Sequence, residues 1–237
     1  MEEKYRWEMC LMDKKIDYTS KDISIRMVTR ITEYLTILKE VKKYEENINS
    51  VDLAVVMNST SAQVRKDLST FGEFGVRGKG YSVKKLIEIL EHILGIDVEN
   101  DLILVGYGKM GSMLASNNKV LGKGFKIVEI FDKDKEKIGK KADGIDLVIK
   151  DSENIEKYVA SSNIKQAILA VNSEEAQKVA EKLVKSGIKG ILNLTAYKIE
   201  LSTDIPIISV DISAKLQELN FWCKHKYLNN IDKFKGV

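Results

Sequence analysis

The sequence predicts an α/β protein with an N-terminal winged helix-turn-helix domain, then a Rossmann domain (a doubly wound parallel sheet), then a C-terminal helix. Three observations predict this fold class. Two short helical patterns flank a polar turn ahead of a glycine-rich segment. Apolar strands then alternate with amphipathic helices, and the first of these strands runs into the pattern G-x-G-x-x-G. A length of 237 residues also favours two domains over one.

The domain boundaries follow from these patterns. We place an N-terminal extension at residues 1–20, the winged-helix domain at 21–97, the Rossmann domain at 98–210 and the C-terminal helix at 211–237. A content of 44% hydrophobic and 31% charged residues is that of an ordinary folded protein rather than a disordered chain.

Composition also excludes several classes of protein. No stretch approaches the ~20 apolar residues that cross a bilayer, and the acidic start of the chain is unlike a signal peptide, so we expect a cytoplasmic protein. Cys10 and Cys223 lie at opposite ends of the chain without metal-ligand spacing. We therefore expect incidental reduced thiols and no metal site.

The first predicted helix covers Arg26–Tyr44. Its apolar residues recur at steps of three or four, which places them on one side of a helix that faces a core. They are Val28, Ile31, Leu35, Leu38 and Val41.

A helix-turn-helix follows. An apolar segment at Val51–Met57 leads through Asn58, Ser59 and Thr60 to a helix at Ala62–Ser69. The hydroxyl of Thr60 or of Ser61 can accept hydrogen bonds from the free amides at the start of that helix. Two short helices joined by a tight polar turn are typical of this motif.

The segment Phe71–Tyr81 predicts a wing. It holds four glycines in eleven residues, which permits the tight turns of a small hairpin, and it carries Arg77 and Lys79. A helix at Val83–Leu94 then leads into the Rossmann domain.

Basic residues gather in this part of the chain. The whole protein has a net charge of +3, whereas Thr60–Lys85 alone has a surplus of four positive charges. Composition leaves two interpretations open, a solvated basic face and a phosphate-binding surface. Within the second helix, Gln63 can pair with an adenine edge and Arg65 and Lys66 with phosphate or guanine.

The predicted DNA-binding residues follow from these patterns. Arg77 and Lys79 could enter a narrow A·T-rich minor groove, where the negative potential is strongest. The complete predicted set is Ser61, Gln63, Arg65, Lys66, Arg77 and Lys79.

Short apolar strands and amphipathic helices alternate after Asp101, which predicts a parallel sheet with helices on both faces. The single proline, Pro206, opens the last strand, where its missing amide does least harm. The predicted strands are Leu102–Val105, Phe125–Phe131, Asp146–Ile149, Ala167–Val171, Gly190–Leu194 and Ile207–Val210.

The glycine pattern after the first strand predicts a dinucleotide site. Gly106 allows the tight turn, Gly108 lets the backbone approach a pyrophosphate, and Gly111 permits close packing of the next helix, whose amides face the phosphates. Asp132 ends the second strand 21 residues beyond Gly111, close to the ~20 expected for the acid that binds the adenosine ribose. Its carboxylate repels a 2′-phosphate, so we expect NAD(H). The predicted contacts are Gly106, Tyr107, Gly108, Lys109, Met110, Gly111 and Asp132.

The C-terminal helix carries more apolar surface than a free helix should. Ile212, Leu216, Leu219 and Cys223 share one stripe, with Phe221 and Trp222 beside it. Packing onto its own domain and crossing to a partner subunit are both open.

Two alternatives to a dinucleotide-controlled DNA-binding protein remain. An NAD-dependent oxidoreductase with an N-terminal accessory domain would need a proton relay, but His92 and His225 lie outside the sheet region and a Tyr81–Lys85 pair precedes the glycine loop. We therefore predict no catalytic residues. A nucleotide-binding dimerisation protein that no longer binds DNA is the second alternative.

The residues of the helix-turn-helix and wing resemble the redox-sensing repressor family Rex. Ser61–Ser69 matches the family's recognition helix, and Phe71–Gly75 with Arg77–Tyr81 matches its wing. The likeness covers roughly Ile25 to Phe221. It continues through Ile93–Gly95, Gly106–Gly111, Phe131–Asp132, Gly187–Asn193 and Val210–Asp211.

The resemblance implies a homodimer whose C-terminal helices are exchanged between subunits. It implies that NAD⁺ permits binding to palindromic operators and that NADH closes the dimer and releases DNA, with Asp211 near the cofactor. Two positions depart from the family pattern. Thr36 stands where many relatives have an arginine that pairs with the aspartate matching Asp211, and Asn193–Ala196 replaces the usual Asn-Phe-Ala-Pro.

Overall fold

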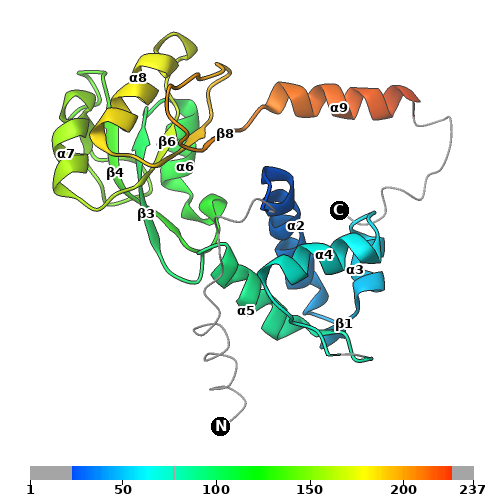
Figure 1. The fold of residues 1–237 in the computed structure, drawn as a ribbon. Helices are drawn as coiled ribbons and strands as arrows, with labels where there is room; N and C mark the ends of the chain where they lie inside the picture. Colours follow the sequence, from blue (N-terminus) through cyan, green and yellow to red (C-terminus); the bar gives the residue numbers. More distant parts are fainter. Residues whose placement is uncertain (1–22, 77, 226–237) are drawn as a thin grey trace. The chain divides into compact units, whose positions relative to one another are not determined.

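The computed structural model describes residues 23–76 and 78–225 (Figure 1). These residues form two compact units that meet in the sequence between Asp97 and Val98, and each is described by itself. The predicted N-terminal extension, Cys10 and Arg77 lie outside the described residues. Within them, no helix is both long and apolar enough to cross a membrane.

Helix α2, Ile25–Val41, forms one wall of the first unit. The side chain of Ser24 caps it by accepting a hydrogen bond from the amide of Met27 at 3.2 Å. The predicted core-facing helix is confirmed, but the assignment of Val28 to the buried stripe is wrong because 40% of its surface is exposed. Met27 takes that place, since it lies four residues before the buried Ile31.

Helices α3, Ser50–Val56, and α4, Ser61–Phe71, confirm the predicted helix-turn-helix. Asn58 turns the chain with a positive φ of 48°, a conformation that asparagine tolerates better than most residues. Of the two predicted caps the structure selects Thr60, whose hydroxyl accepts from the amide of Gln63 at 3.1 Å.

The wing is a short antiparallel structure. Strands β1, Asn47–Ile48, and β2, Tyr81–Ser82, pair with each other, and an isolated bridge joins Val76 to Gly80. Gly80 has a φ of +76°, and a Cβ atom there would lie 2.5 Å from the carbonyl oxygen of Ile48. Strand β1 carries no sequence signal of its own because two residues show no periodicity. Helix α5, Val83–Ile93, follows.

The second unit contains a six-stranded parallel sheet in the order β5-β4-β3-β6-β7-β8. The chain starts in the middle at β3, builds outwards to β5, then returns to β6 beside β3, which is the doubly wound order. The strands are β3 Asn100–Val105, β4 Phe125–Asp132, β5 Ile149–Asp151, β6 Gln166–Leu169, β7 Gly190–Asn193 and β8 Ile207–Ser209.

Both faces of this sheet are covered, as predicted (Figure 1). Ile103 and Val105 of β3 pack in one core with α7, Ile155–Ser161, and α8, Ser173–Ser186. Leu102 and Leu104 belong to the opposite core with α6, Lys109–Ser116. Alternate residues of one strand therefore supply two cores. Short 3-10 turns, η1 Asn118–Leu121 and η2 Ser152–Asn154, complete the unit.

The prediction for the third strand is wrong by three residues. Asp146–Val148 belongs to a turn around Gly144, where Lys141 bridges to Val148, and β5 begins at Ile149. The apolar residues before and within β5 do not show in the sequence where the strand begins. The pairing of Ile149 with Ile130 of β4 decides it.

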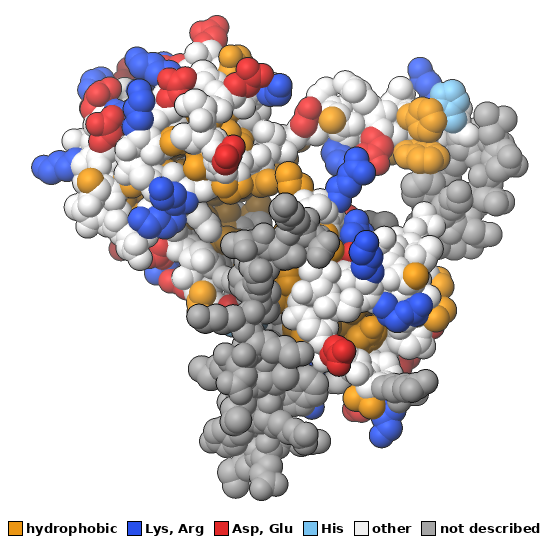
Figure 2. All heavy atoms as spheres, viewed as in Figure 1, with side chains coloured by type: hydrophobic (Ala, Val, Ile, Leu, Met, Phe, Trp, Pro, Cys, Tyr) orange, Lys and Arg blue, Asp and Glu red, His pale blue; other side chains and the backbone are white. Residues whose placement is uncertain are grey.

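Helix α9, Ile212–His225, follows β8. None of its residues is buried, and the apolar side chains predicted to need cover are exposed. Figure 2 shows hydrophobic side chains grouped near the end of this helix, where the ring of Phe221 lies against those of Trp222 and His225.

Candidate functional site

The glycine loop after β3 leaves no room for a side chain at two of its glycines. Gly106 has a φ of +100°, and an added Cβ would lie 2.4 Å from the carbonyl oxygen of Ala170. A Cβ on Gly111 would lie 2.0 Å from the carbonyl oxygen of Gly106. The turn therefore packs tightly against β6 on one side and against α6 on the other.

Gly108 differs from these two glycines because it faces open space. No atom lies within 4 Å of a Cβ built on it. It is also the N-cap residue of α6, so the free amides of that helix begin beside it. A bare backbone next to a helix N-terminus is the arrangement that accepts a pyrophosphate.

Asp132 ends β4 beside this loop and is only 8% exposed. Its carboxylate accepts hydrogen bonds from the amide of Tyr107 at 2.6 Å and from the amide of Asp134 at 2.8 Å. The first bond ties the glycine loop to the end of the neighbouring strand. Each carboxylate oxygen keeps a lone pair that ribose hydroxyls can use.

A cavity of about 940 Å³ opens above these residues at the carboxyl edge of the sheet. Gly106, Gly108 and Asp132 line one side of it, and Ala170 and Asn172, which follow β6, line another. The cavity thus lies where the strand order reverses between β3 and β6, the place where open α/β sheets bind ligands. Its volume lies within the usual range for ligand pockets, ~300–1,000 Å³.

The β6 and α8 side of the cavity was missed in the sequence. The sequence could have indicated this side. The carboxyl ends of parallel strands lie at the same edge of a sheet, so the residues after Leu169 must lie near the glycine loop. Lys133, which also lines the cavity, pairs with Glu175 of α8 at 2.8 Å. Lys133 and Glu175 are 42 positions apart in the sequence, and the fold of the sheet brings them together.

Five predicted cofactor residues do not line the cavity. Tyr107 turns its hydroxyl to the amide of Asp143, from which it accepts a hydrogen bond at 2.7 Å. Lys109 and Met110 are exposed in the first turn of α6. Asp211 accepts from the amide of Ala214 at 2.9 Å and so caps α9. Gly111, which also lies outside the lining, packs beneath the loop.

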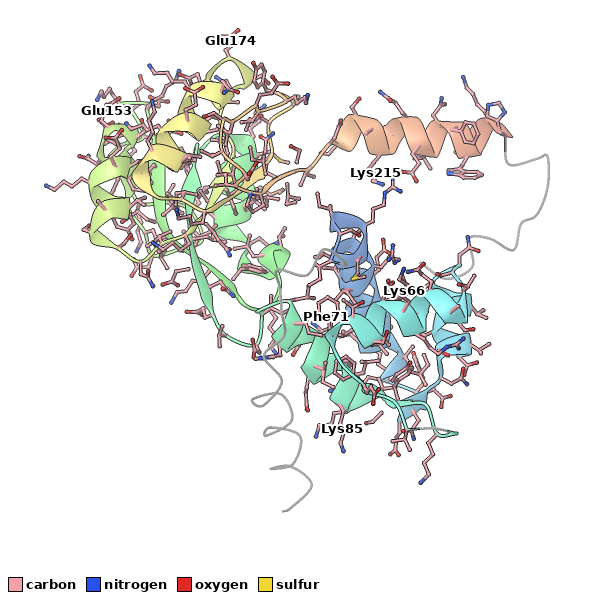
Figure 3. The ribbon with its side chains drawn as sticks, in the orientation of Figure 1. Lys66, Phe71, Lys85, Glu153, Glu174 and Lys215 are labelled. Atoms are coloured by element: carbon pink, nitrogen blue, oxygen red, sulfur yellow. The ribbon has the colours of Figure 1, made fainter. Side chains whose placement is uncertain are left out.

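Helix α4 presents one polar face and buries the other. Val64, Leu68 and Phe71 are buried, whereas Arg65 and Lys66 are exposed (Figure 3). The guanidinium of Arg65 donates to the hydroxyl of Ser50 at 3.0 Å, which links the two helices of the motif.

Three other predicted DNA contacts, Ser61, Gln63 and Lys79, also lie within the described residues. Ser61 and Gln63 are partly exposed in the first turn of α4. Lys79 is exposed in the turn that the Val76–Gly80 bridge closes.

A buried carboxylate lies behind this polar face. Asp67 is fully buried and bonds to Arg30 and Tyr34 of α2 and to Gln63. Burial alone would raise the pKa of Asp67, but the hydrogen bonds from Arg30, Tyr34 and Gln63 outweigh burial and lower it. In the sequence, Asp67 lowers the net positive charge of Thr60–Lys85. In the structure it is buried, so it is not part of the exposed basic surface.

The two departures noted in the sequence have local structural roles. The hydroxyl of Thr36 donates to the carbonyl of Thr32 at 3.0 Å and lies on the exposed side of α2. Thr195 donates its amide and hydroxyl to the side-chain oxygen of the buried Asn193, at 3.0 and 2.7 Å. Asn193 in turn donates to the carbonyl of Tyr197 at 2.9 Å, which closes a compact turn after β7.

A helix-turn-helix with a wing, joined to a Rossmann unit with an open glycine loop, defines the class of nucleotide-responsive DNA-binding regulators. Comparisons with family models agree with both halves. Residues 22–69 match the model described as putative DNA-binding protein N-terminus, and residues 97–197 match the model described as CoA binding domain.

The curated relatives identify the family. The chain is 40% identical over 201 residues to the redox-sensing transcriptional repressor Rex 1 of Thermotoga maritima, which covers 85% of this chain and 94% of the relative. It is 39% identical over 195 residues to the repressor Rex of Desulforamulus reducens, covering 82% and 92%. The chain belongs to the Rex family of redox-sensing transcriptional repressors.

Solved structures give the same result. A crystal structure of RSP, a Rex-family repressor, has a TM-score of 0.79 at 30% identity and covers 87% of this chain and 96% of its own. RSP in complex with β-NAD⁺ and operator DNA has a TM-score of 0.79 at 31% identity, covering 87% and 94%. Since these relatives are repressors, the oxidoreductase alternative is not supported.

Proposed function

We propose that this protein is a DNA-binding repressor that senses the NADH/NAD⁺ ratio and leaves palindromic operators when NADH binds. The observation that carries the proposal is the open side of the glycine loop at Gly108, which faces a cavity of about 940 Å³. The same chain carries an exposed basic helix after a tight turn. A related repressor, RSP, has been crystallised with β-NADH and with β-NAD⁺ and operator DNA.

The residues around the cavity fit a dinucleotide without a 2′-phosphate. The pyrophosphate would lie against the backbone of Gly108 and the first amides of α6. Asp132 would accept hydrogen bonds from the adenosine ribose, and its charge would repel a 2′-phosphate. The nicotinamide supplies the redox state that is read, and the protein supplies position and electrostatics.

On the DNA side, α4 would enter the major groove. Arg65, Lys66 and the wing residue Lys79 would contact phosphates, Gln63 a base edge and Ser61 the backbone at the helix start. Because its target is DNA, we place the protein in the cytoplasm.

Helix α9 would supply the dimer contact. Its exposed apolar stripe, which includes Leu216 and Leu219 at 59% and 57% exposure, needs cover, and a second copy of the chain offers it. NADH must then bind the DNA-releasing state of the dimer better than the DNA-bound state, because a ligand of equal affinity for both shifts nothing.

The test is a titration of NADH and, separately, NAD⁺ into the protein bound to a labelled palindromic duplex. Release is expected with NADH, and NAD⁺ should be much less effective. An equal response to both would remove the redox-sensing claim and leave DNA binding intact.

A matched variant tests the DNA side. Replacing Arg65 and Lys66 by alanine should weaken binding and reduce its salt dependence by ~3.6 units of slope, since the dimer loses two phosphate contacts in each subunit and each contact contributes about 0.9. Unchanged binding would show that Arg65 and Lys66 do not contact the DNA. A wild-type protein that binds no duplex would favour the alternative of a nucleotide-binding dimerisation protein.

A further inference from the structure

Asp67 of α4 is a carboxylate with no exposed surface, and four side-chain donors surround it. Arg30 donates from Nε at 2.6 Å and from Nη2 at 2.7 Å. Tyr34 donates its hydroxyl at 2.9 Å, and Gln63 donates from Nε2 at 2.7 Å. An ionised carboxylate offers about four acceptor sites, so this one is fully used.

The bond to Gln63 fixes which way its amide faces. A free glutamine amide can rotate by half a turn and exchange its oxygen and nitrogen. An ionised carboxylate only accepts hydrogen bonds, so Asp67 can face the amide nitrogen and never the oxygen. Gln63 lies one helical turn before Asp67 and is partly exposed, so its oxygen and its second N–H remain available to a ligand.

Arg30 and Tyr34 keep the carboxylate in the form that this orientation requires. Their hydrogen bonds favour the ionised state over the protonated one, which could donate to the Gln63 oxygen. Both come from α2, outside the helix-turn-helix, so the orientation of a side chain on the recognition helix is set by a different helix.

We propose that Asp67 is a positioning residue for base recognition, which holds the Gln63 amide in the one orientation that matches adenine and rejects guanine. In the major groove adenine presents a donor and an acceptor, whereas guanine presents two acceptors. An amide that shows one oxygen and one N–H complements the first pattern. An amide free to turn could offer both N–H groups to guanine. The proposal rests on the DNA-binding function proposed above.

The experiment begins with duplexes that the wild-type protein selects from a pool of random sequence. Every base pair of the selected duplex is then replaced in turn, and the dissociation constants of wild type and Gln63→Ala are compared. The position at which Gln63→Ala alone loses its preference is the one that Gln63 contacts. There the wild type should favour A·T over G·C by about tenfold or more, the discrimination of a bidentate pair.

The deciding variant is Asp67→Asn, which keeps the shape of the side chain but lets it donate. Its preference for A·T should fall to within about threefold at the Gln63 position and stay unchanged elsewhere. Combining it with Gln63→Ala should cause no further loss. If Asp67→Asn fails to fold, the Arg30→Gln/Asp67→Asn variant removes both charges together and repeats the test, since no unpaired buried charge remains.

A second ion pair supplies the matched control. Lys39 of α2 pairs with the buried Glu91 of α5 at 3.1 Å, an ion pair of a buried carboxylate that does not involve α4. Glu91→Gln should lower the melting temperature and leave every base preference intact.

Three results would overturn the proposal. Asp67→Asn could keep the full preference for adenine, Gln63→Ala could lose no preference at any position, or Asp67→Asn could weaken all positions evenly, as a structural defect would. A wild-type protein that selects no duplex would instead remove the DNA-binding function itself, and the inference with it.

Discussion

Alanine substitutions at the three glycines of the loop after β3 should affect stability differently, with Gly106 and Gly111 on one side and Gly108 on the other. At Gly111 an added Cβ meets the carbonyl oxygen of Gly106 at 2.0 Å, and at Gly106 it meets that of Ala170 at 2.4 Å. Such contacts force the backbone to move, which typically costs about 1–3 kcal/mol, and the positive φ of Gly106 adds about 1–2 kcal/mol. We expect the free energy of unfolding to fall by about 1–3 kcal/mol in Gly111→Ala and by about 2–5 kcal/mol in Gly106→Ala.

Gly108→Ala should behave differently because the folded chain has room for the methyl group. Its φ of −83° and ψ of −164° are open to alanine, and no atom lies within 4 Å of the new Cβ. Removing a glycine also restricts the unfolded chain, so stability should stay unchanged or rise by up to ~1 kcal/mol. The methyl group instead fills space that a pyrophosphate needs.

Calorimetry with and without NADH separates these effects. NADH at 100 times its dissociation constant should stabilise the wild-type Rossmann unit by about 2.7 kcal/mol. Gly108→Ala should melt with the wild type when free and lose that increment, whereas Gly111→Ala should melt several degrees lower already without ligand. A Gly108→Ala variant that kept the full NADH increment would refute the placement of the phosphates.

Two further predictions concern the dimer and the buried carboxylate. The double variant Leu216→Glu/Leu219→Glu places charges on the exposed apolar stripe of α9, so light scattering should show a monomer instead of a dimer. The control Gln217→Glu, which adds a charge to the same helix, should leave the dimer intact. An unchanged mass for the double variant would contradict a dimer formed through α9. The pKa of Asp67 is lowered from its ordinary value of 3.8, so its contribution to stability is complete above that pH and is lost as pH falls through the lower folded value. In urea unfolding, wild type should therefore exceed Asp67→Asn in stability at pH 7 and by a smaller margin near pH 3, and an equal margin at both would count against an ionised Asp67.

Local patterns predicted the helix-turn-helix and the glycine turn between β3 and α6. The polar turn, the cap at Thr60 and the spacing of apolar residues all act within a few positions of the chain. The role of Gly111 also follows from local geometry, since an added Cβ there would meet the carbonyl oxygen of Gly106, five residues earlier. The close contact at Gly106 is with Ala170, 64 positions further along the chain, and depends on the tertiary structure.

Other features were out of reach because they depend on contacts between distant residues. The burial of Met27 in place of Val28 depends on how α2 packs against its neighbours. The start of β5 depends on its pairing with β4, and the far wall of the cavity depends on the position of β6. In each case the local sequence was compatible with more than one choice of buried residues or strand boundaries.

By itself, the sequence determined the two-domain class, the glycine turn and the basic recognition helix, because periodicity, capping and backbone freedom are properties of neighbouring residues. Only the tertiary structure decided that Asp67 lies on the buried side of α4 and is bound to Arg30, 37 positions away. The sequence shows that a residue is charged but does not show whether it is buried. Its burial and its hydrogen bonds depend on the helix that packs against it.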